Sequence, residues 1–556
     1  MKNILLFAAL LLAGSAAQAG TFSMVQINPN AGYCDNVWSD SSKYYYGAGD
    51  LKHFAQLNGL LYFVATDQPY NDELWVTDGT QAGTHKIKDI NPNGGSGIGD
   101  LRVVGNKIFF LANETKSDAT PTDDYDLYAS DGTTAGTVKV KDLDQPFNTL
   151  LGEDNAGVTN GKIVFCTQTD VMVTDGSTSG TRSLAAINLT GYTTANGYCE
   201  MNGNVYFIVN SDIWKSDGTT TGTKAVKSIT DSANCHWNLA FASKIKAFNG
   251  KLYIIGSQSG FGPDLYTFDG TEMGAVTKVL NLPMGNAYPD NLRECGGSLW
   301  FSAYDTSSYA LFKVNGTGAD RICTINSTLS YSGNKILFPN DWNNGYHVVD
   351  ALTGAQSEFG RSSLSLNGIG FSANPNTVLV MGNKIIYQAY DSATGYQVMC
   401  ITDGTSEGIQ VVMPSDAATS HPFDYTPGCG LIDVFDFTTY GNKVVIPADF
   451  NNAGRELWFY EADDLINGIL EHAQSAISIY PNPAHDRLTI DLGKEQSLSS
   501  DVAIQLIDMS GRVVSSAAIA DQKAQVSVSS LATGSYVVNV TNGNSLIARQ
   551  KVTVAH

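Results

Sequence analysis

The chain has 556 residues, of which 43% are hydrophobic and 16% are charged. At about 100–200 residues per domain it is too long for one small domain, and its apolar content argues against disorder. Acidic residues outnumber basic ones, 54 to 33, and the formal charge is −21. Because nucleic acids and anionic membranes bind clustered positive charge, the composition argues against both as partners. The 55 glycines, 26 tyrosines and 23 phenylalanines favour β-structure with many turns.

Residues 1–19 have the pattern of a secretory signal peptide. Lys2 supplies the positive start, Ile4–Leu12 the apolar core, and Ala17-Gln18-Ala19 a small-x-small cleavage site. The pattern predicts cleavage between Ala19 and Gly20. The apolar run is too short to span a bilayer, and no other stretch approaches 18 apolar residues. We therefore expect an exported protein without a transmembrane segment.

Export changes the interpretation of the cysteines. No two form a CxxC pair, which excludes zinc-ribbon and thioredoxin-type sites. An even number in an oxidising compartment permits disulfides, but buried free thiols in strands are an equal alternative, as for Cys166 and Cys400. The eight cysteines are Cys34, Cys166, Cys199, Cys235, Cys295, Cys323, Cys400 and Cys429.

One phrase recurs through the middle of the chain. Its fullest copy is ELWVTDGTQAGT at Glu73–Thr84, and the last copy, ELWFY at Glu456–Tyr460, stops before the DGT loop. Further copies begin at Asp126, Asp170, Asp212, Asp264 and Gln397. The tryptophans of this phrase lie within strand patterns, where core between neighbouring repeats explains them better than a sugar-stacking surface; they are Trp75, Trp214 and Trp458.

A second phrase, a glycine turn followed by an apolar run, precedes each copy. Nine such glycines recur about 48 residues apart on average, and this period indicates a propeller or a solenoid. They are Gly59, Gly105, Gly161, Gly203, Gly250, Gly297, Gly333, Gly382 and Gly441. Each unit contains about four strands joined by tight reversals, as in a propeller blade. We predict an all-β chain with a single β-propeller of seven to nine four-stranded blades.

The register of the last two strands of a unit can be tested on paper. If Thr77 lies opposite Thr84, the repeated acid falls opposite a lysine in three units. Such a cross-strand pair is favourable and would explain the acid without a ligand. The expected pairs are Glu73 with Lys88, Asp126 with Lys141, and Asp212 with Lys227.

The ends of the repeat region predict how the ring closes. The last unit lacks its outer strand, and Phe22–Asn30 resembles the outer strand of the first unit, His85–Asn93. The N-terminal strand should therefore complete the last blade and leave no open edge. Cys34 and Cys429 would lie near this seam, and they are the candidate disulfide.

These units resemble the ELWxxDGT repeat of exported proteins from Bacteroidota-type bacteria, over about residues 22–460. The resemblance implies a secreted or surface propeller and supplies no catalytic residues. The expected boundaries are a signal peptide at 1–19, the propeller at 20–462, a linker at 463–476 and a further module at 477–556.

The module at 477–556 has alternating β-branched residues between turns, which predicts a small β-sandwich. It resembles the C-terminal sorting domain of the type IX secretion system. The resemblance implies recognition by that secretion machinery at the outer membrane, often with removal of the module. An ordinary β-sandwich for binding is the alternative. The matching residues are Tyr480, Pro481, Asn482, Pro483, Gly511, Arg512, Gly534 and Tyr536.

Catalytic and metal-binding motifs are not found. None of the eight histidines forms HExxH, and no GxSxG elbow, P-loop or dinucleotide fingerprint occurs. The DGT loops lack the alternating acids of a calcium loop, and Asp-Gly is a turn requirement. Three looser acidic candidates, which we interpret as solvated turns, are Asp341 with Asn343 and Asn344, Asp449 with Asn451 and Asn452, and Asp123 with Asp124. We predict no metal and no cofactor.

Two functions from different classes remain. The first is a cell-surface or secreted binding or adhesion protein that holds a glycan or protein ligand at one face of the propeller. The alternative is a secreted hydrolase or lyase that uses acids at the central channel, since such sites leave no local motif. Unpaired carboxylates gathered in one concave opening would favour the enzyme. The missing motifs favour the binding protein.

Overall fold

A computed structural model describes most of the chain. The described residues are 21–27, 51–67, 71–115, 124–145, 150–152, 154–189, 195–210, 212–228, 244–257, 263–271, 274, 276–279, 287–305, 307–315, 318–325, 329–339, 346–359, 369–371, 378–382, 384–391, 396–404, 409–412, 437–448, 456–461, 478–481, 484–491, 502–508, 513–517, 523–529, 531–542 and 545–556. Their regular secondary structure is β-strand, which confirms the all-β prediction. Within these ranges no helix has the length and apolarity to cross a bilayer.

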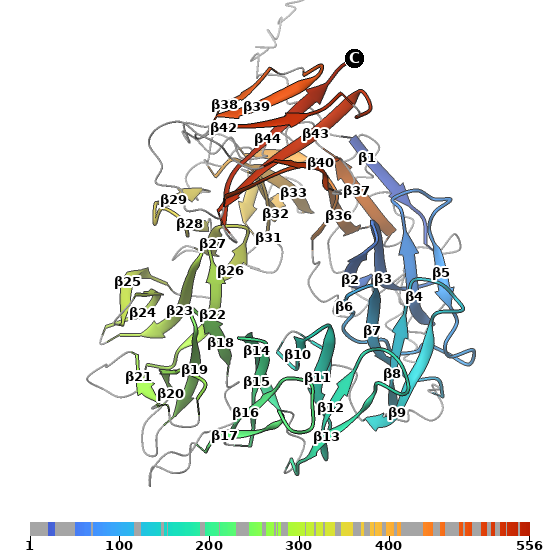
Figure 1. Ribbon diagram of the computed structural model, residues 1–556, viewed down its shortest axis with the longest axis vertical. Coiled ribbons are helices and arrows are strands. Elements are labelled where there is room, and N and C mark those ends of the chain that lie inside the picture. Colours follow the sequence, from blue (N-terminus) through green and yellow to red (C-terminus); the bar gives the residue numbers. More distant parts are fainter. Residues whose placement is uncertain are drawn as a thin grey trace, which may run out of the picture. The chain divides into compact units, whose positions relative to one another are not determined.

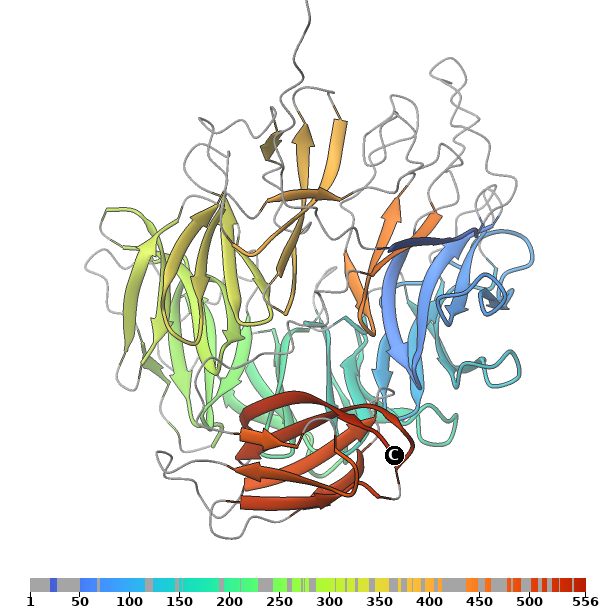
Figure 2. The ribbon, with the colours of Figure 1, turned by 90° about the horizontal axis from the view of Figure 1, so that it is seen from above.

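The chain forms two compact units. The larger runs through Phe22–Leu379 and Ile386–Tyr460, and the smaller includes Glu461–His556. The larger unit contains nine antiparallel sheets, which follow one another around a ring (Figures 1 and 2). We call them blades 1 to 9. Nine lies at the upper end of the predicted range of seven to nine.

Blades 1 to 5 each have four strands in chain order. Blade 1 contains β2 (Lys52–Leu57), β3 (Leu60–Thr66), β4 (Asp72–Thr77) and β5 (His85–Lys88), and blade 2 contains β6 (Arg102–Val104), β7 (Lys107–Ala112), β8 (Tyr125–Ser130) and β9 (Val138–Gln145). Blade 3 contains β10 (Ala156–Thr159), β11 (Lys162–Cys166), β12 (Asp170–Thr174) and β13 (Arg182–Ala186), and blade 4 contains β14 (Asn196–Met201), β15 (Asn204–Val209), β16 (Asp212–Ser216) and β17 (Lys224–Ser228). Blade 5 contains β18 (Ile245–Phe248), β19 (Lys251–Ser257), β20 (Pro263–Phe268) and β21 (Thr277–Lys278).

Blades 6 and 7 repeat this order, blade 8 has a fifth strand, and blade 9 ends with the N-terminal strand. Blade 6 contains β22 (Asp290–Cys295), β23 (Ser298–Tyr304), β24 (Tyr309–Val314) and β25 (Ala319–Thr324), and blade 7 contains β26 (Ser330–Ser332), β27 (Lys335–Pro339), β28 (Tyr346–Asp350) and β29 (Gln356–Phe359). Blade 8 contains β30 (Ile369–Phe371), β31 (Val378–Met381), β32 (Lys384–Asp391), β33 (Tyr396–Thr402) and β34 (Gln410–Val412). Blade 9 contains β35 (Thr438–Tyr440), β36 (Lys443–Ala448), β37 (Glu456–Glu461) and β1 (Thr21–Val25).

Neighbouring blades are joined by apolar clusters. The cluster between blades 1 and 2, for example, combines Val64 and Leu74 of one sheet with Phe110 and Tyr128 of the other. Similar clusters join blades 2 to 7 in sequence and blade 9 to blade 1. Two tryptophans of the repeated phrase, Trp75 and Trp214, pack in such clusters, as predicted. The third, Trp458, is buried.

The DGT loops are held by their own side chains. In blade 2, Asp131 Oδ1 accepts from the backbone N–H of Thr133 at 2.9 Å and from its hydroxyl at 2.8 Å. These bonds lower the pKa of Asp131. The second glycine of the loop, Gly136, lies directly against this carboxylate, since a Cβ atom there would be 2.0 Å from Asp131 Oδ1. The motif is therefore a self-contained turn, as its sequence predicts.

The predicted acid–lysine register is wrong. Thr77 and Thr84 do face each other, with their hydroxyls 2.6 Å apart, but a bulge follows between Leu74 and Trp75. The extra residue places Leu74, not Glu73, opposite Lys88. The same one-residue shift places Leu127 opposite Lys141 and Ile213 opposite Lys227, in place of Asp126 and Asp212.

The repeated acid instead binds the segment that leaves the outer strand. Glu73 is fully buried, and its Oε1 accepts from Asn91 N at 3.2 Å and from Ser96 Oγ at 2.5 Å. Asp126 accepts from Leu143 N at 2.8 Å and lies 3.1 Å from Lys139 Nζ. Burial raises the pKa of Glu73 to about 7.

Ring closure by the N-terminal strand is confirmed. β1 pairs with β37 as the outer strand of blade 9. Ile27 N donates to Glu456 Oε2 at 2.5 Å, which repeats the contact between Glu73 and the strand exit of blade 1. Phe22 packs on Tyr460 with ring centroids 4.7 Å apart, and Val25 is buried.

The smaller unit contains a two-layer β-sandwich. One sheet has the order β38 (Ser478–Tyr480), β39 (Arg487–Asp491) and β42 (Lys523–Ser527); the other has the order β41 (Val513–Ala517), β40 (Val502–Asp508), β43 (Gly534–Asn542) and β44 (Ser545–Val554). Alternate residues such as Leu488, Val526 and Val538 are fully or nearly fully buried and form one apolar core. This agrees with the predicted sandwich of short strands.

Candidate functional site

The two faces of the propeller differ in their connections. Because the strands of each blade alternate in direction, the first strands all begin at one face, where the chain arrives from the preceding blade. In the sequence, the longest intervals between consecutive strands of the propeller stand directly before first strands, namely before β2, β18 and β35. The opposite face carries the repeated glycine turns and DGT loops. Binding sites in such folds occupy the variable loops at one end of a rigid scaffold.

A cavity of about 800 Å³ lies at this first face, within the larger unit. The first strands of blades 1 to 5 and of blade 9 line it, so six blades contribute to one opening. Its volume lies within the range of about 300–1,000 Å³ that small-molecule sites have. The polar and aromatic residues of the lining are His53, Phe54, Asp100, Arg102, Tyr198, Glu200, Lys246, Phe437 and Thr438.

A bulge in the first strand shapes the wall of this cavity. In β2 the register shifts between Lys52 and Ala55, and His53 there has a φ of +55°. The corresponding bulges of β14 and β22 place Gly197 at φ +63° and Asn291 at φ +55°. Glycine and asparagine accept this backbone region readily, whereas histidine does so less often. The bulge brings His53 Nδ1 to 3.4 Å from Asp100 Oδ1 of the next blade.

The other charged groups of the cavity are held by partners on their walls. Arg102 Nη1 donates to the carbonyl oxygens of Leu151 and Gly152, at 3.5 and 3.2 Å. Glu200 Oε1 accepts from Val158 N at 2.8 Å. Lys246 Nζ lies 3.7 Å from Asp154 Oδ1. Positively and negatively charged side chains are therefore held in place around the same cavity by their hydrogen bonds and ion pairs.

The hydrolase alternative requires unpaired carboxylates in this opening. Of the two that line it, Asp100 faces His53 and Glu200 is exposed and holds a backbone N–H. In the described part of the cavity wall, no group of unpaired carboxylates is present.

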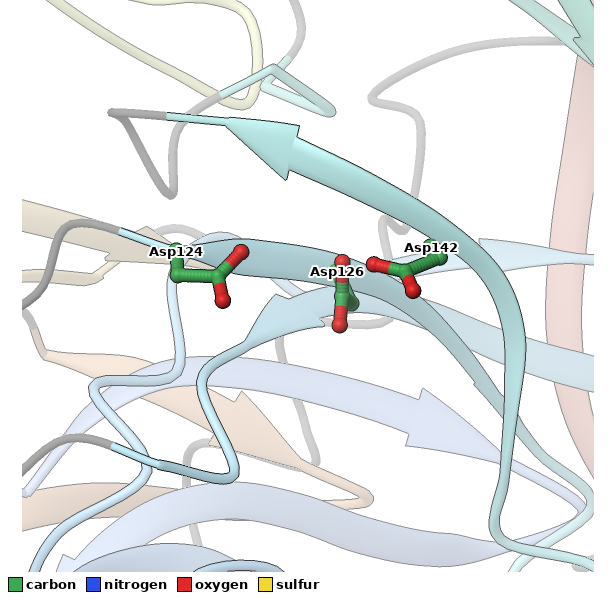
Figure 3. Close-up of side chains that lie close together, drawn as sticks. All are labelled: Asp124, Asp126 and Asp142. Atoms are coloured by element: carbon green, nitrogen blue, oxygen red, sulfur yellow. The ribbon is translucent and has the colours of Figure 1, made fainter.

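An acidic group lies elsewhere, in blade 2. Oxygens of Asp124, Asp126 and Asp142 lie within 4.8 Å of one another, and Figure 3 shows the three carboxylates near the adjacent strands β8 and β9. Asp126 is already bound by Leu143 N and Lys139. Lys139 also lies 2.6 Å from Glu114. Asp126 thus accepts from the backbone after its bulge in the outer strand, as Glu73 does from Asn91 in blade 1. Lys139 is its counter-ion.

The structure places four of the predicted sorting residues at the ends of sandwich strands. Tyr480 ends β38, is 45% exposed, and is followed by Pro481 through a cis bond. Gly534 begins β43, and the buried Tyr536 donates its hydroxyl to Ala532 O at 2.9 Å. The other four, Asn482, Pro483, Gly511 and Arg512, lie outside the described residues.

The predicted cleavage site, Ala19–Gly20, and the candidate disulfide, Cys34–Cys429, also lie outside the described residues. The five described cysteines are free thiols: Cys166, Cys199, Cys295, Cys323 and Cys400. Cys166 and Cys400 are buried in strands, in line with the free-thiol interpretation. Burial raises the pKa of Cys166 and of Cys199 to about 12.

The comparison with protein families decides the nature of the smaller unit. The family of secretion system C-terminal sorting domains matches residues 478–555. Residues 478–555 are a sorting domain of the type IX secretion system. The domain directs the protein to the cell surface or the medium, and it implies contact with the secretion machinery. No curated protein matches the sequence.

Several solved structures are similar in architecture at low identity. A prolyl endopeptidase has 12% identity and a TM-score of 0.37, and the match covers 63% of this chain and 54% of that one. The extracellular domain of a putative one-component system from B. thetaiotaomicron has 12% identity and a TM-score of 0.27, over 93% and 76% of the two chains. PorZ, a surface component of the type IX secretion system of Porphyromonas gingivalis, has 12% identity and a TM-score of 0.19, over 97% and 100%. At these scores the propeller assignment stands on the strand order of the chain itself.

The cavity residues were missed by sequence reasoning, although a weak signal was present. Arg102 and Lys246 lie at the third position before their hairpin turns, opposite Phe109 and Tyr253. Glu200 lies at the second position, opposite Val205 and three residues before Gly203. Blade 6 has Glu294 at this position, before Gly297. Charged residues in the first strands of several repeats were thus the available signal, since first strands of several blades line the cavity.

Proposed function

We propose that this protein is a binding protein of the cell surface or the medium, exported by the type IX secretion system, which holds its ligand in the cavity at the channel mouth. The observation that carries the proposal is that opening of about 800 Å³, lined by residues of six blades. The resemblance to ELWxxDGT repeats of exported proteins supports the same location.

The repeated loops of the opposite face are engaged in the fold itself. Lys107 of blade 2 donates to the carbonyl oxygens of Asp175 and Gly176 in the DGT loop of blade 3, at 3.4 and 3.2 Å. Tyr206 of blade 4 donates to Gly270 O of blade 5 at 3.3 Å. Because these loops join neighbouring blades, the first face is the better candidate for ligands.

The export part of the proposal is tested by the intact mass and location of the native protein. We expect a species at the cell surface or in the medium that lacks residues 1–19, and also lacks about the last 80 residues if the sorting domain is removed on export. A full-length mature chain confined to the periplasm would contradict export. The sandwich would then have to be tested as a binding domain.

The binding part is tested on the mature chain, residues 20–556. The immobilised protein is exposed to a glycan array, extracellular-matrix proteins and bacterial envelope fractions. A bound class should be lost in a Glu200→Ala, Lys246→Met double variant that keeps the wild-type melting temperature. Equal binding by this variant would move the site away from the cavity. No binding in any of the three classes would end the proposal.

A further inference from the structure

The cavity is balanced in charge although the chain is strongly acidic. Its lining contains two bases, Arg102 and Lys246, and two acids, Asp100 and Glu200, beside His53, whereas the whole chain has a formal charge of −21. We propose that the cavity binds a short, uncharged oligosaccharide. This inference rests on the proposed function and names the ligand class of the same site.

An anionic ligand fits this site poorly. The field of a chain with 21 excess negative charges opposes the approach of an anion. The two bases do not form an anion cradle either. Arg102 donates to two backbone carbonyl oxygens, and Lys246 has Asp154 at 3.7 Å, so each base already faces acceptors.

A cationic ligand finds no excess of acid among the described residues that line the cavity. Asp100 lies 3.4 Å from His53, and Glu200 accepts from Val158 N at 2.8 Å. The field of the whole chain attracts cations, but a cation that enters meets Arg102 and Lys246 as readily as the two carboxylates. Removing a cation from water without a dedicated counter-charge is unfavourable.

A sugar matches what the cavity offers. A hydroxyl group both donates and accepts, so a row of hydroxyls can use a wall on which donors such as Lys246 and acceptors such as Glu200 lie close together. Phe54, which is partly exposed, adds aromatic surface for the C–H face of a sugar ring. The volume of about 800 Å³ suits a ligand of a few rings.

The test compares trisaccharides of one size and different charge. The mature chain is titrated by calorimetry at pH 6.0, where the amines of chitosan are protonated, with neutral cellotriose, maltotriose, xylotriose and triacetylchitotriose. The charged probes are trigalacturonate and the chitosan trimer. We expect at least one neutral probe to bind at least tenfold more tightly than either charged probe. Its Kd should change less than twofold between 50 and 500 mM NaCl, because no counter-ion is released.

A matched pair of glutamate variants tests whether the ligand binds in the cavity. Glu200 and Glu294 are exposed glutamates at the same position of two first strands, three residues before the turn glycine, but only Glu200 lines the cavity. Glu200→Ala should weaken binding at least tenfold, whereas Glu294→Ala should stay within twofold of wild type. Lys246→Met provides a second cavity variant in case Glu200→Ala lowers the melting temperature.

The outcomes separate the ligand class from the proposed function. Tighter binding of trigalacturonate or of the chitosan trimer, sensitive to Glu200→Ala, would overturn the neutral class and keep the cavity as the site. Neutral binding that both glutamate variants and Lys246→Met leave unchanged would overturn the cavity as the site. If no trisaccharide binds at 5 mM, the oligosaccharide class is wrong, and the protein and envelope probes above then decide the binding function by themselves.

Discussion

The hydroxyl of Tyr62 in blade 1 occupies the space beside the Cα atom of Gly132 in blade 2. A Cβ atom at Gly132 would lie 2.2 Å from Tyr62 Oη, and Gly132 has a φ of +93°. The pair Tyr206 with Gly270 repeats the relationship between blades 4 and 5, where a Cβ atom would lie 2.8 Å from Tyr206 Oη. The first glycine of the DGT loop therefore serves the turn and the seam between blades at the same time.

Replacing Tyr62 with alanine should open this seam. Tyr62 is 2% exposed and belongs to the cluster between blades 1 and 2. Loss of a buried aromatic side chain costs about 3–5 kcal/mol, whereas Tyr62→Phe removes only the hydroxyl and should cost under about 1.5 kcal/mol. Urea unfolding of the mature chain, followed by tryptophan fluorescence, measures both. Equal stability of the two variants would contradict the seam role.

Gly136→Ala should destabilise blade 2 through a single contact. A Cβ atom at this position would lie 2.0 Å from Asp131 Oδ1, which is fixed by Thr133. We expect a cost of about 1–3 kcal/mol in the wild-type background and under about 1 kcal/mol when Asp131 is already alanine. A double-mutant cycle measures this difference. Gly318→Ala is the control, because its nearest neighbour, Val279 O, would lie at an ordinary 3.6 Å.

Glu73 should make the stability of the protein fall as the pH rises. Burial raises the pKa of Glu73 from 4.5 to about 7, with Asp89 adding to the rise and Ser96 and Asn91 opposing it. Since the folded pKa exceeds the unfolded one, this contribution is fully present below about pH 4.5 and is lost between there and about pH 7. The loss amounts to about 3 kcal/mol. Glu73→Gln should remove this slope in melting curves from pH 5 to 8. Retention of the slope would contradict the assignment, and Glu294→Gln, which changes an exposed glutamate, should retain it.

Removal of the N-terminal strand should leave blade 9 open. A chain that begins at Asn28 lacks Phe22, Val25 and Ile27, and so loses the ring contact with Tyr460 and the backbone donor to Glu456. An unpaired strand edge favours aggregation. We expect a lower melting temperature and concentration-dependent aggregation in light scattering. Addition of the peptide of residues 21–30 should reverse part of both effects, whereas the same peptide with Ile27→Pro should not. A truncated chain as stable as wild type would contradict closure by β1.

The cysteines should contain at most one internal disulfide. Five of the eight are free thiols, which leaves Cys34, Cys235 and Cys429. We expect a Cys34–Cys429 bond, because the connections that carry them lead into β2 and β35, both of which line the same cavity. Non-reducing peptide mapping of the native protein tests this. Cys166 and Cys199 should react with iodoacetamide only after unfolding, since burial raises the pKa of both thiols to about 12.

The fold could be predicted where the repeat makes the pattern visible. The turn glycines such as Gly59, the DGT loops and the similarity of Phe22–Asn30 to His85–Asn93 recur, and recurrence distinguished turns and strands from chance. They led to a closed ring of four-stranded blades and to a separate sandwich. The structure agrees with each of these features.

The register and the cavity could not be predicted in the same way. A bulge adds one residue without a change in composition, so the shift that separates Glu73 from Lys88 leaves no local signal. The cavity takes two to four residues from each of six blades, and residues such as His53 and Lys246 are nearly 200 positions apart. Only the closed ring brings them together.

The bond between Ile27 and Glu456 joins residues that are 429 positions apart. During synthesis from the N-terminus at about 5–20 residues per second, β1 is complete roughly 20–90 s before its partner strand exists. Throughout this interval the oldest strand of the protein has its buried face uncovered and its backbone donors free for any other edge. Ring closure therefore cannot occur before the last blade is present. Chaperones that bind extended segments in the compartment where the chain folds would act first on residues 21–27.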